Sequence, residues 1–216
     1  MNIQTRKLLV CFVGVDGSGK TTHAKSLSRF LLNKGYSVKY VHAATRPILT
    51  YPFLIITRVF GYWKSMKKNA YTDPLDLLAS LEVKRALGSL YRCLIFLDYL
   101  IINLIRIQIP RLLSSCVICD RYVYDLIIDL ALSELHSNSF ANLLLLSTSR
   151  PGKVFFMQSN EDVLSQRRPD FTEMEIQAKA NAYGRLAILL DFETIRTEDQ
   201  FEKNQEHIRN IILSML

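Results

Sequence analysis

Short apolar runs and longer amphipathic stretches alternate along the chain. The short runs are rich in β-branched residues and predict strands, whereas the longer stretches have the apolar spacing of helices. The predicted strands are Leu8–Gly14, Ser37–His42, Ser115–Asp120, Lys153–Gln158 and Thr194–Thr197. The predicted helices are Thr21–Lys34, Leu75–Leu87, Ser89–Leu113, parts of Leu126–Leu146, Asn160–Arg167, Thr172–Leu190 and Asp199–Leu216. Strands that alternate with helices predict an α/β fold, with a parallel sheet covered by helices on both faces.

One stretch, Arg46–Lys68, fits neither pattern. It contains Pro47, Pro52 and Gly61 among aromatic and basic residues. We expect a loop-rich insertion near the functional site, within a single domain that spans residues 1–216.

A glycine-rich segment lies between the first predicted strand and the first predicted helix. It matches the phosphate-binding pattern G-x-x-x-x-G-K-[ST] with Gly14, Val15, Asp16, Gly17, Ser18, Gly19, Lys20 and Thr21. In such a loop the backbone N–H groups and the helix N-terminus face phosphate oxygens. Lys20 can then reach the β- and γ-phosphates, and the Thr21 hydroxyl can ligate Mg²⁺. The alternative is a glycine-rich turn that matches by chance.

An acid ends the third predicted strand. Asp120 is followed by Arg121 and Tyr122. In phosphate-loop proteins an acid at this place organises Mg²⁺, directly or through water. Arg121 is then placed for an anionic group. The alternative is an aspartate in an ordinary turn at the end of a strand.

Together these segments resemble the thymidylate kinase family. The matching segments are Phe12–Thr22, Thr45-Arg46-Pro47, Asp120-Arg121-Tyr122, Leu164–Arg168 and Ala182–Ala187, in the order that the family has them. The resemblance implies a P-loop kinase fold with a five-stranded parallel sheet and a short lid at about 165–173. It also implies transfer of a phosphoryl group from ATP to a nucleoside monophosphate, most simply dTMP, with Mg²⁺ as cofactor, in a homodimer packed through helices.

The resemblance also implies roles for individual residues. Asp16 would contact the acceptor's sugar or help to order the transferred phosphoryl group, and Arg46 would hold the acceptor phosphate. The implied catalytic residues are Lys20, Asp16, Asp120, Arg167 and Arg168. The implied ATP-binding residues are Gly14, Asp16, Gly17, Ser18, Gly19, Lys20, Thr21 and Thr22, and the implied metal ligands are Thr21 and Asp120. The implied substrate-binding residues are Asp16, Arg46, Arg121 and Tyr122.

The positive charge that phosphoryl transfer requires supports the assignment of a lid independently of the resemblance. Phosphoryl transfer needs positive charge on the equatorial oxygens, and the loop contains no arginine. Arg167 and Arg168, just before Pro169, are the obvious source. The alternative is a solvated basic pair at a helix C-terminus, where the helix dipole favours it.

The chain departs from the family where the acceptor's base would be recognised. Ile48–Tyr51 replaces a Glu-Pro-Gly-Gly-Thr-like segment, and Asp125 and Ile128-Asp129 stand where a Ser and a Tyr-Gln pair are usual. Tyr99 or Leu100 falls where the family has an arginine. Because carboxylates accept hydrogen bonds, we expect relaxed base choice that favours an amino-bearing base or another acceptor.

A polar stripe on the predicted helix Ser89–Leu113 and its N-terminal neighbour is a further candidate. Its members are Arg85, Arg92, Tyr99, Asn103 and Arg106. On a continuous helix they share one face, which would line the acceptor site with Arg92 or Tyr99 reading a base. The alternative is the ordinary solvent face of a core helix.

The composition and net charge of the chain limit the classes of ligand and partner that we expect it to bind. The formal net charge is +7, which suits polyanions, but the basic residues are scattered and favour small phosphate ligands over nucleic acid. A nucleotide-binding switch or an ATP-driven DNA-binding protein remains the alternative from another class. Leu94–Ile109 is apolar but is interrupted by polar residues, so we expect no membrane span, which needs about 20 mostly apolar residues. Leu94–Ile107 has more apolar surface than one contact requires, which also predicts a homodimer.

The cysteines indicate the compartment. Cys116 and Cys119 have C-x₂-C spacing, but in a strand residues three apart face opposite sides, which argues against zinc or redox chemistry. We expect buried, reduced thiols in a cytoplasmic protein.

Overall fold

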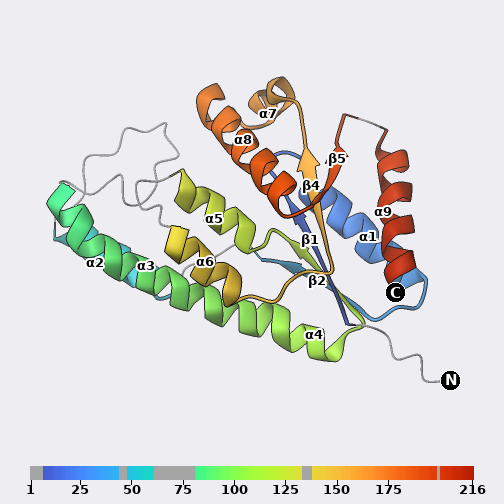
Figure 1. The fold of residues 1–216 in the computed structure, drawn as a ribbon, viewed down its shortest axis with the longest axis horizontal. Helices are drawn as coiled ribbons and strands as arrows, with labels where there is room; N and C mark the ends of the chain where they lie inside the picture. Colours follow the sequence, from blue (N-terminus) through green and yellow to red (C-terminus); the bar gives the residue numbers. More distant parts are fainter. Residues whose placement is uncertain (1–6, 44–47, 61–80, 133–137, 199) are drawn as a thin grey trace.

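A five-stranded parallel sheet forms the centre of the protein (Figure 1). The computed structural model describes residues 7–43, 48–60, 81–132, 138–198 and 200–216. The strands are β1 Leu8–Val13, β2 Val38–His42, β3 Cys116–Asp120, β4 Lys153–Gln158 and β5 Glu193–Arg196. They lie in the order β2-β3-β1-β4-β5, and every neighbouring pair is parallel. The prediction of a parallel sheet with helices on both faces is confirmed.

Helices cover the sheet in two layers (Figure 1). The helices are α1 Lys20–Asn33, α2 Thr50–Val59, α3 Leu81–Asn103, α4 Ile109–Leu113, α5 Val123–Ala131, α6 Asn138–Leu146, α7 Glu161–Arg167, α8 Glu173–Leu189 and α9 Phe201–Met215. Helices α1 and α9 pack on one face of the sheet, and α3, α5, α6 and α8 pack on the other.

The side chains of the central strand β1 explain why both helix layers pack on the sheet. All six of its residues are buried. Leu9, Cys11 and Val13 join the core under α3, α5 and α8, while the alternate side chains of β1 join the core under α1 and α9. A strand with apolar residues on both faces is stable only between two layers, because each face must be removed from water.

Cys116 and Cys119 lie in different cores on opposite faces of β3, as predicted. All four cysteines are free thiols, and three of them are buried, but Cys93 is exposed, so the expectation of buried thiols is wrong for Cys93.

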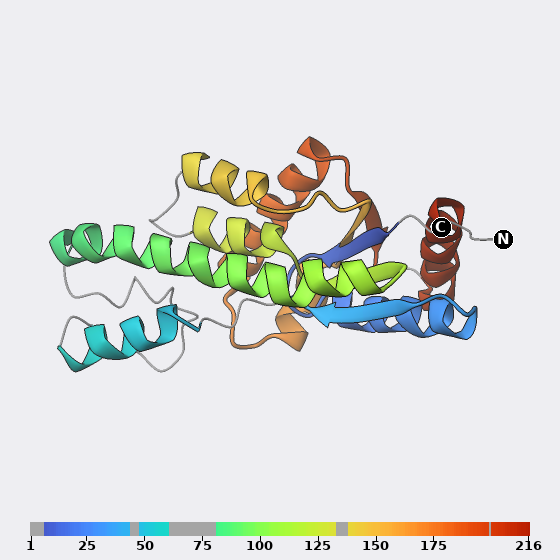
Figure 2. The same ribbon diagram turned by 90° about the horizontal axis from the view of Figure 1, so that it is seen from below.

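The longest element is a helical rod that crosses one face of the molecule (Figure 2). It comprises α3, a π-helical segment Leu104–Gln108, and α4. The predicted break before Ser89 is wrong: α3 runs through Gly88, which is buried, because tertiary packing outweighs the weak helix propensity of glycine.

By length and composition alone, Leu87–Leu113 is one helix that could cross a membrane, and 33% of its most apolar window is buried. Apolar helices of this kind also occur in the cores of proteins. The expectation that no segment spans a membrane therefore stays a prediction.

The π-helical segment changes which side chains share a face of the rod. Within this wider turn Ile107 is buried in the core, whereas Arg106 is exposed and donates to the His42 carbonyl oxygen over 3.2 Å. Tyr99 is 2% exposed and Asn103 is buried. The prediction that the polar stripe shares one face is therefore wrong, and the side chain of Arg85 lies outside the described residues.

A helix also replaces part of the predicted loop-rich insertion. Helix α2 lies beside the N-terminal part of α3 (Figure 2). The buried Asp98 carboxylate of α3 accepts hydrogen bonds from Leu49 N at 2.7 Å, Thr50 N at 2.8 Å and the Thr50 hydroxyl at 2.6 Å. Burial alone would raise the pKa of Asp98, but these hydrogen bonds hold it below its usual value. One helix therefore supplies the N-terminal cap of another.

We expect Asp98→Asn to lower the free energy of unfolding by about 1–3 kcal/mol, because buried donors at the start of α2 lose a charged acceptor. Urea denaturation measures the loss, and faster amide exchange should appear first in α2. Glu206→Gln on the exposed face of α9 is the control for the charge change. An unchanged midpoint for Asp98→Asn would show that this carboxylate does not hold α2.

Burial of His23 makes stability depend on pH. The ring lies against Gln205, with 2.6 Å between His23 Nδ1 and Gln205 Nε2, and burial lowers its pKa from 6.5 to about 4. In the unfolded state His23 takes up a proton near pH 6.5, whereas in the folded state it does so only near pH 4. The free energy of unfolding is therefore highest above pH 6.5 and decreases as the pH falls towards about 4. Denaturation midpoints should fall over this window, and His23→Gln should flatten the decrease. An equally steep decrease in that variant would assign it to other groups.

Candidate active site

The phosphate loop follows β1 at the carboxyl end of the sheet. Gly14 has a φ of +143°, and a Cβ there would lie 2.5 Å from the Met157 carbonyl oxygen of β4. Only glycine fits this position, because any side chain would meet fixed backbone. Gly17, with a φ of +92°, lies under the segment that joins α7 and α8. The loop is therefore held between β4 and the predicted lid.

Lys20 sits inside the loop. Its Nζ donates to the carbonyl oxygens of Gly14 at 2.7 Å and Val15 at 2.8 Å, and lies 3.6 Å from Asp16 Oδ1. The side chain is 5% exposed, and burial lowers the pKa of its ammonium group. The charge thus lies where a phosphate group cradled by the loop would meet it.

Asp120 and Thr21 meet at the metal position that the sequence predicts. The Thr21 hydroxyl donates to Asp120 Oδ2 over 2.6 Å. Asp120 is fully buried, and its Oδ1 has no hydrogen-bond partner among the described residues. A hydroxyl and a free carboxylate oxygen are ligands that Mg²⁺ accepts, with phosphates and water completing its coordination. These two residues therefore fit the predicted metal.

Two residues that the sequence analysis missed also reach Asp120. The Tyr40 hydroxyl donates to Asp120 Oδ2 over 2.9 Å, and His42 Nδ1 lies 3.0 Å from the same oxygen. Their i, i+2 spacing at the end of β2 was the available signal. It could not be used without knowing that β2 pairs with β3.

Arg121 contacts the phosphate loop. Its backbone is left-handed, with a φ of +72°, and its guanidinium bonds the Asp16 carboxylate and lies 3.8 Å from Asp125. Burial would lower the pKa of Arg121, but the negative charges of Asp125 and Asp16 outweigh burial and raise this pKa above its usual value. Burial would raise the pKa of Asp16, but Lys20 and Arg121 hold it below its usual value. Both groups are therefore charged, and the uncommon backbone conformation aims the guanidinium at the loop.

Asp125 and Asp129, the carboxylates at which the sequence departs from the thymidylate kinase pattern, already have partners inside the protein. Asp125 is buried and accepts from the Tyr183 hydroxyl at 2.8 Å and Tyr122 N at 3.0 Å. Burial raises its pKa, against the charges of Lys20 and Arg121. Asp129 pairs with Lys179 over 2.7 Å. In this arrangement their oxygens serve internal partners, which weakens the expectation that they read an amino-bearing base.

The two lid arginines have different partners. Arg167, the last residue of α7, donates to the Gly17 carbonyl oxygen over 2.9 Å. Arg168 makes a two-bond pair with Asp170, at 2.9 and 2.6 Å, and its guanidinium lies 4.8 Å from the Phe171 ring. The structure thus separates two residues that the sequence treated alike.

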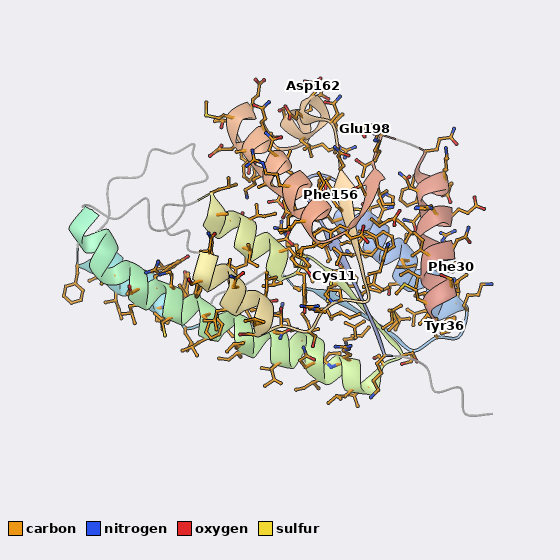
Figure 3. All side chains as sticks on the ribbon, in the orientation of Figure 1. Cys11, Phe30, Tyr36, Phe156, Asp162 and Glu198 are labelled. Atoms are coloured by element: carbon orange, nitrogen blue, oxygen red, sulfur yellow. The ribbon has the colours of Figure 1, made fainter. Side chains whose placement is uncertain are left out.

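The lid adjoins the strand ends. Figure 3 shows Asp162 of α7 and Glu198, which follows β5, at the same end of the sheet. Glu198 accepts a hydrogen bond from Asn160 N just before α7, so the loop after β5 holds the start of the helix that leads into the lid.

A groove of about 550 Å³ adjoins the loop along α1 and faces α9. It is lined in part by Thr21, Thr22, Lys25, Arg29 and Arg209. The basic side chains give this side of the loop a positive potential that favours anions.

Three other predicted substrate residues are buried or bonded elsewhere. Tyr99 is buried in the core, and Arg92 donates to Ser89 on its own helix over 3.2 Å. Tyr122 is 2% exposed, and its hydroxyl donates to the Ser149 carbonyl oxygen over 2.6 Å, which makes it a packing residue. Arg46 lies outside the described residues.

No known family model matches this sequence, and no curated protein is similar to it. In fold, the chain is similar to the thymidylate kinase from Ehrlichia chaffeensis, with a TM-score of 0.57 and 15% sequence identity. The alignment covers 95% of this chain and 98% of that one. At this identity the likeness establishes the fold, which is that of a P-loop kinase.

Proposed function

We propose that this chain transfers the γ-phosphoryl group of ATP to a nucleoside monophosphate, with dTMP as the first candidate acceptor. One observation supports this best: two guanidinium groups from separate elements contact the phosphate loop, Arg121 at Asp16 and Arg167 at Gly17. Phosphoryl transfer depends on positive charge placed around the transferred group. A nucleotide-binding switch has no need of both.

The residues divide the work as follows. The loop backbone and Lys20 bind the donor phosphates, and Thr21 and Asp120 would hold Mg²⁺, which supplies charge neutralisation. Arg167 stabilises charge on the transferred group, and Arg121, oriented by Asp16 and Asp125, binds the acceptor phosphate.

A different acceptor is the second candidate. It is favoured because Tyr99 is buried and the oxygens of Asp125 accept from Tyr183 and Tyr122, so two of the residues expected at the base are engaged inside the protein. The donor half of the proposal is the same in both cases.

Turnover with ATP and a panel of acceptors tests the proposal. The panel should contain the deoxy and ribo monophosphates of all bases together with nucleosides. Turnover with one or more monophosphates supports the leading function. Turnover with another acceptor alone promotes the second candidate, and nucleotide binding without transfer to any acceptor would indicate a switch.

We further propose a homodimer of a single-domain, cytoplasmic protein. Within Leu94–Ile107, the large side chains of Leu97, Ile101, Leu104 and Ile105 are exposed by 37–56%. Such a continuous apolar surface is typical of an interface.

The surface of the rod gives a direct test. We expect wild-type protein at micromolar concentration to scatter light as a dimer and Leu97→Lys/Ile101→Lys to scatter as a monomer, because two charges would be buried without partners. Lys203→Gln on α9 is the control and should remain dimeric. A monomeric wild type would contradict the proposal.

A further inference from the structure

The end of β2 directs two polar side chains at one oxygen. β2 and β3 pair in parallel with His42 opposite Asp120. Tyr40 and His42 are two residues apart and project to the same face of the sheet. Both reach Asp120 Oδ2, at 2.9 and 3.0 Å, where the Thr21 hydroxyl also donates at 2.6 Å. Three groups from two elements therefore converge on a single carboxylate oxygen.

The second carboxylate oxygen of Asp120, Oδ1, is available to a ligand. Asp120 Oδ1 is buried and has no hydrogen-bond partner among the described residues. A buried carboxylate oxygen without a partner is costly, so it calls for an explanation. With Oδ2 saturated, Oδ1 is the oxygen that can accept a cation or a water bound to one.

The backbone at the end of β2, which carries both side chains, is itself held. Arg106, from the π-helical segment, donates to the His42 carbonyl oxygen over 3.2 Å, and Ala43 N donates to the Asp120 carbonyl oxygen over 2.9 Å. The strand end that presents Tyr40 and His42 is thus held by neighbouring elements.

From this geometry we infer that Tyr40 and His42 are positioning residues: they hold Asp120 through Oδ2 so that Oδ1 serves the divalent cation bound with the donor nucleotide. The inference rests on the proposed function, because it takes the phosphate loop to be the donor site. Partners of this kind orient a ligating carboxylate, and their loss weakens metal affinity by about tenfold to a hundredfold.

Mn²⁺ binding tests this role without turnover. The full chain is titrated with Mn²⁺ in the presence of a non-hydrolysable ATP analogue, and free Mn²⁺ is followed by electron paramagnetic resonance. Five variants are compared: Tyr40→Phe, His42→Leu, these two combined, His42→Asn and, as a control on the opposite face of β2, Lys39→Gln. Asparagine keeps a donor near the place of Nδ1. Circular dichroism and the thermal transition establish that each variant is folded.

We expect Tyr40→Phe combined with His42→Leu to weaken Mn²⁺ binding about tenfold or more, while affinity for the analogue without metal changes little. His42→Asn should keep most of the affinity that His42→Leu loses, and Lys39→Gln should match the wild type. Unchanged Mn²⁺ affinity in the folded double variant would overturn the inference, as would equal losses for His42→Asn and His42→Leu. A wild type that binds neither the analogue nor Mn²⁺ would overturn the proposed function itself, and the inference with it.

Discussion

Replacement of Lys20 by methionine should lower kcat/KM for phosphoryl transfer by about 10³-fold while the protein stays folded. The ammonium group lies inside the phosphate loop, on the carbonyl oxygens of Gly14 and Val15, where it meets the charge of the transferred group. Methionine fills a similar volume but carries no charge, so the loss is mainly electrostatic. Steady-state rates with ATP and the best acceptor measure it, beside circular dichroism and thermal unfolding.

Lys34→Met is the matched control, because Lys34 is an exposed lysine just past the C-terminal end of the same helix, away from the phosphate loop. It should keep near-normal rates. Near-normal turnover by folded Lys20→Met would mean that this loop is not the donor site.

Arg167→Ala should lower kcat by about 10³-fold or more with little change in KM for the acceptor, because its contact strengthens only in the transition state. The physical basis is its position: Arg167 donates to Gly17 of the phosphate loop. Single-turnover rates separate this effect from product release.

Arg168→Ala is the matched comparison, one residue away. Its guanidinium is satisfied by Asp170 and stacked near Phe171, so we expect little change in kcat. The opposite order of effects would show that the lid rearranges when nucleotide binds. Intact kcat in both variants would contradict the lid interpretation.

The sequence by itself determined the features that depend on neighbouring residues. The phosphate loop is contiguous, and the apolar runs of β1, β3 and β4 must be buried on both faces wherever they pair. β4 was predicted with its observed bounds, Lys153–Gln158, because Pro151-Gly152 punctuates its start. Asp120 was found for the same reason, since it directly follows a buried run.

Only the tertiary structure decided the contacts that depend on distance and on helical phase. The π-helical segment Leu104–Gln108 breaks the regular phase of the rod, and within it Arg106 is exposed whereas Ile107 is in the core. The Asp98 cap on α2 joins residues that are 48 and 49 positions apart in the sequence. Tyr40 and His42 meet Asp120 only because β2 pairs with β3. Such contacts leave no local periodicity, because each is set by how whole elements pack rather than by the residues beside it.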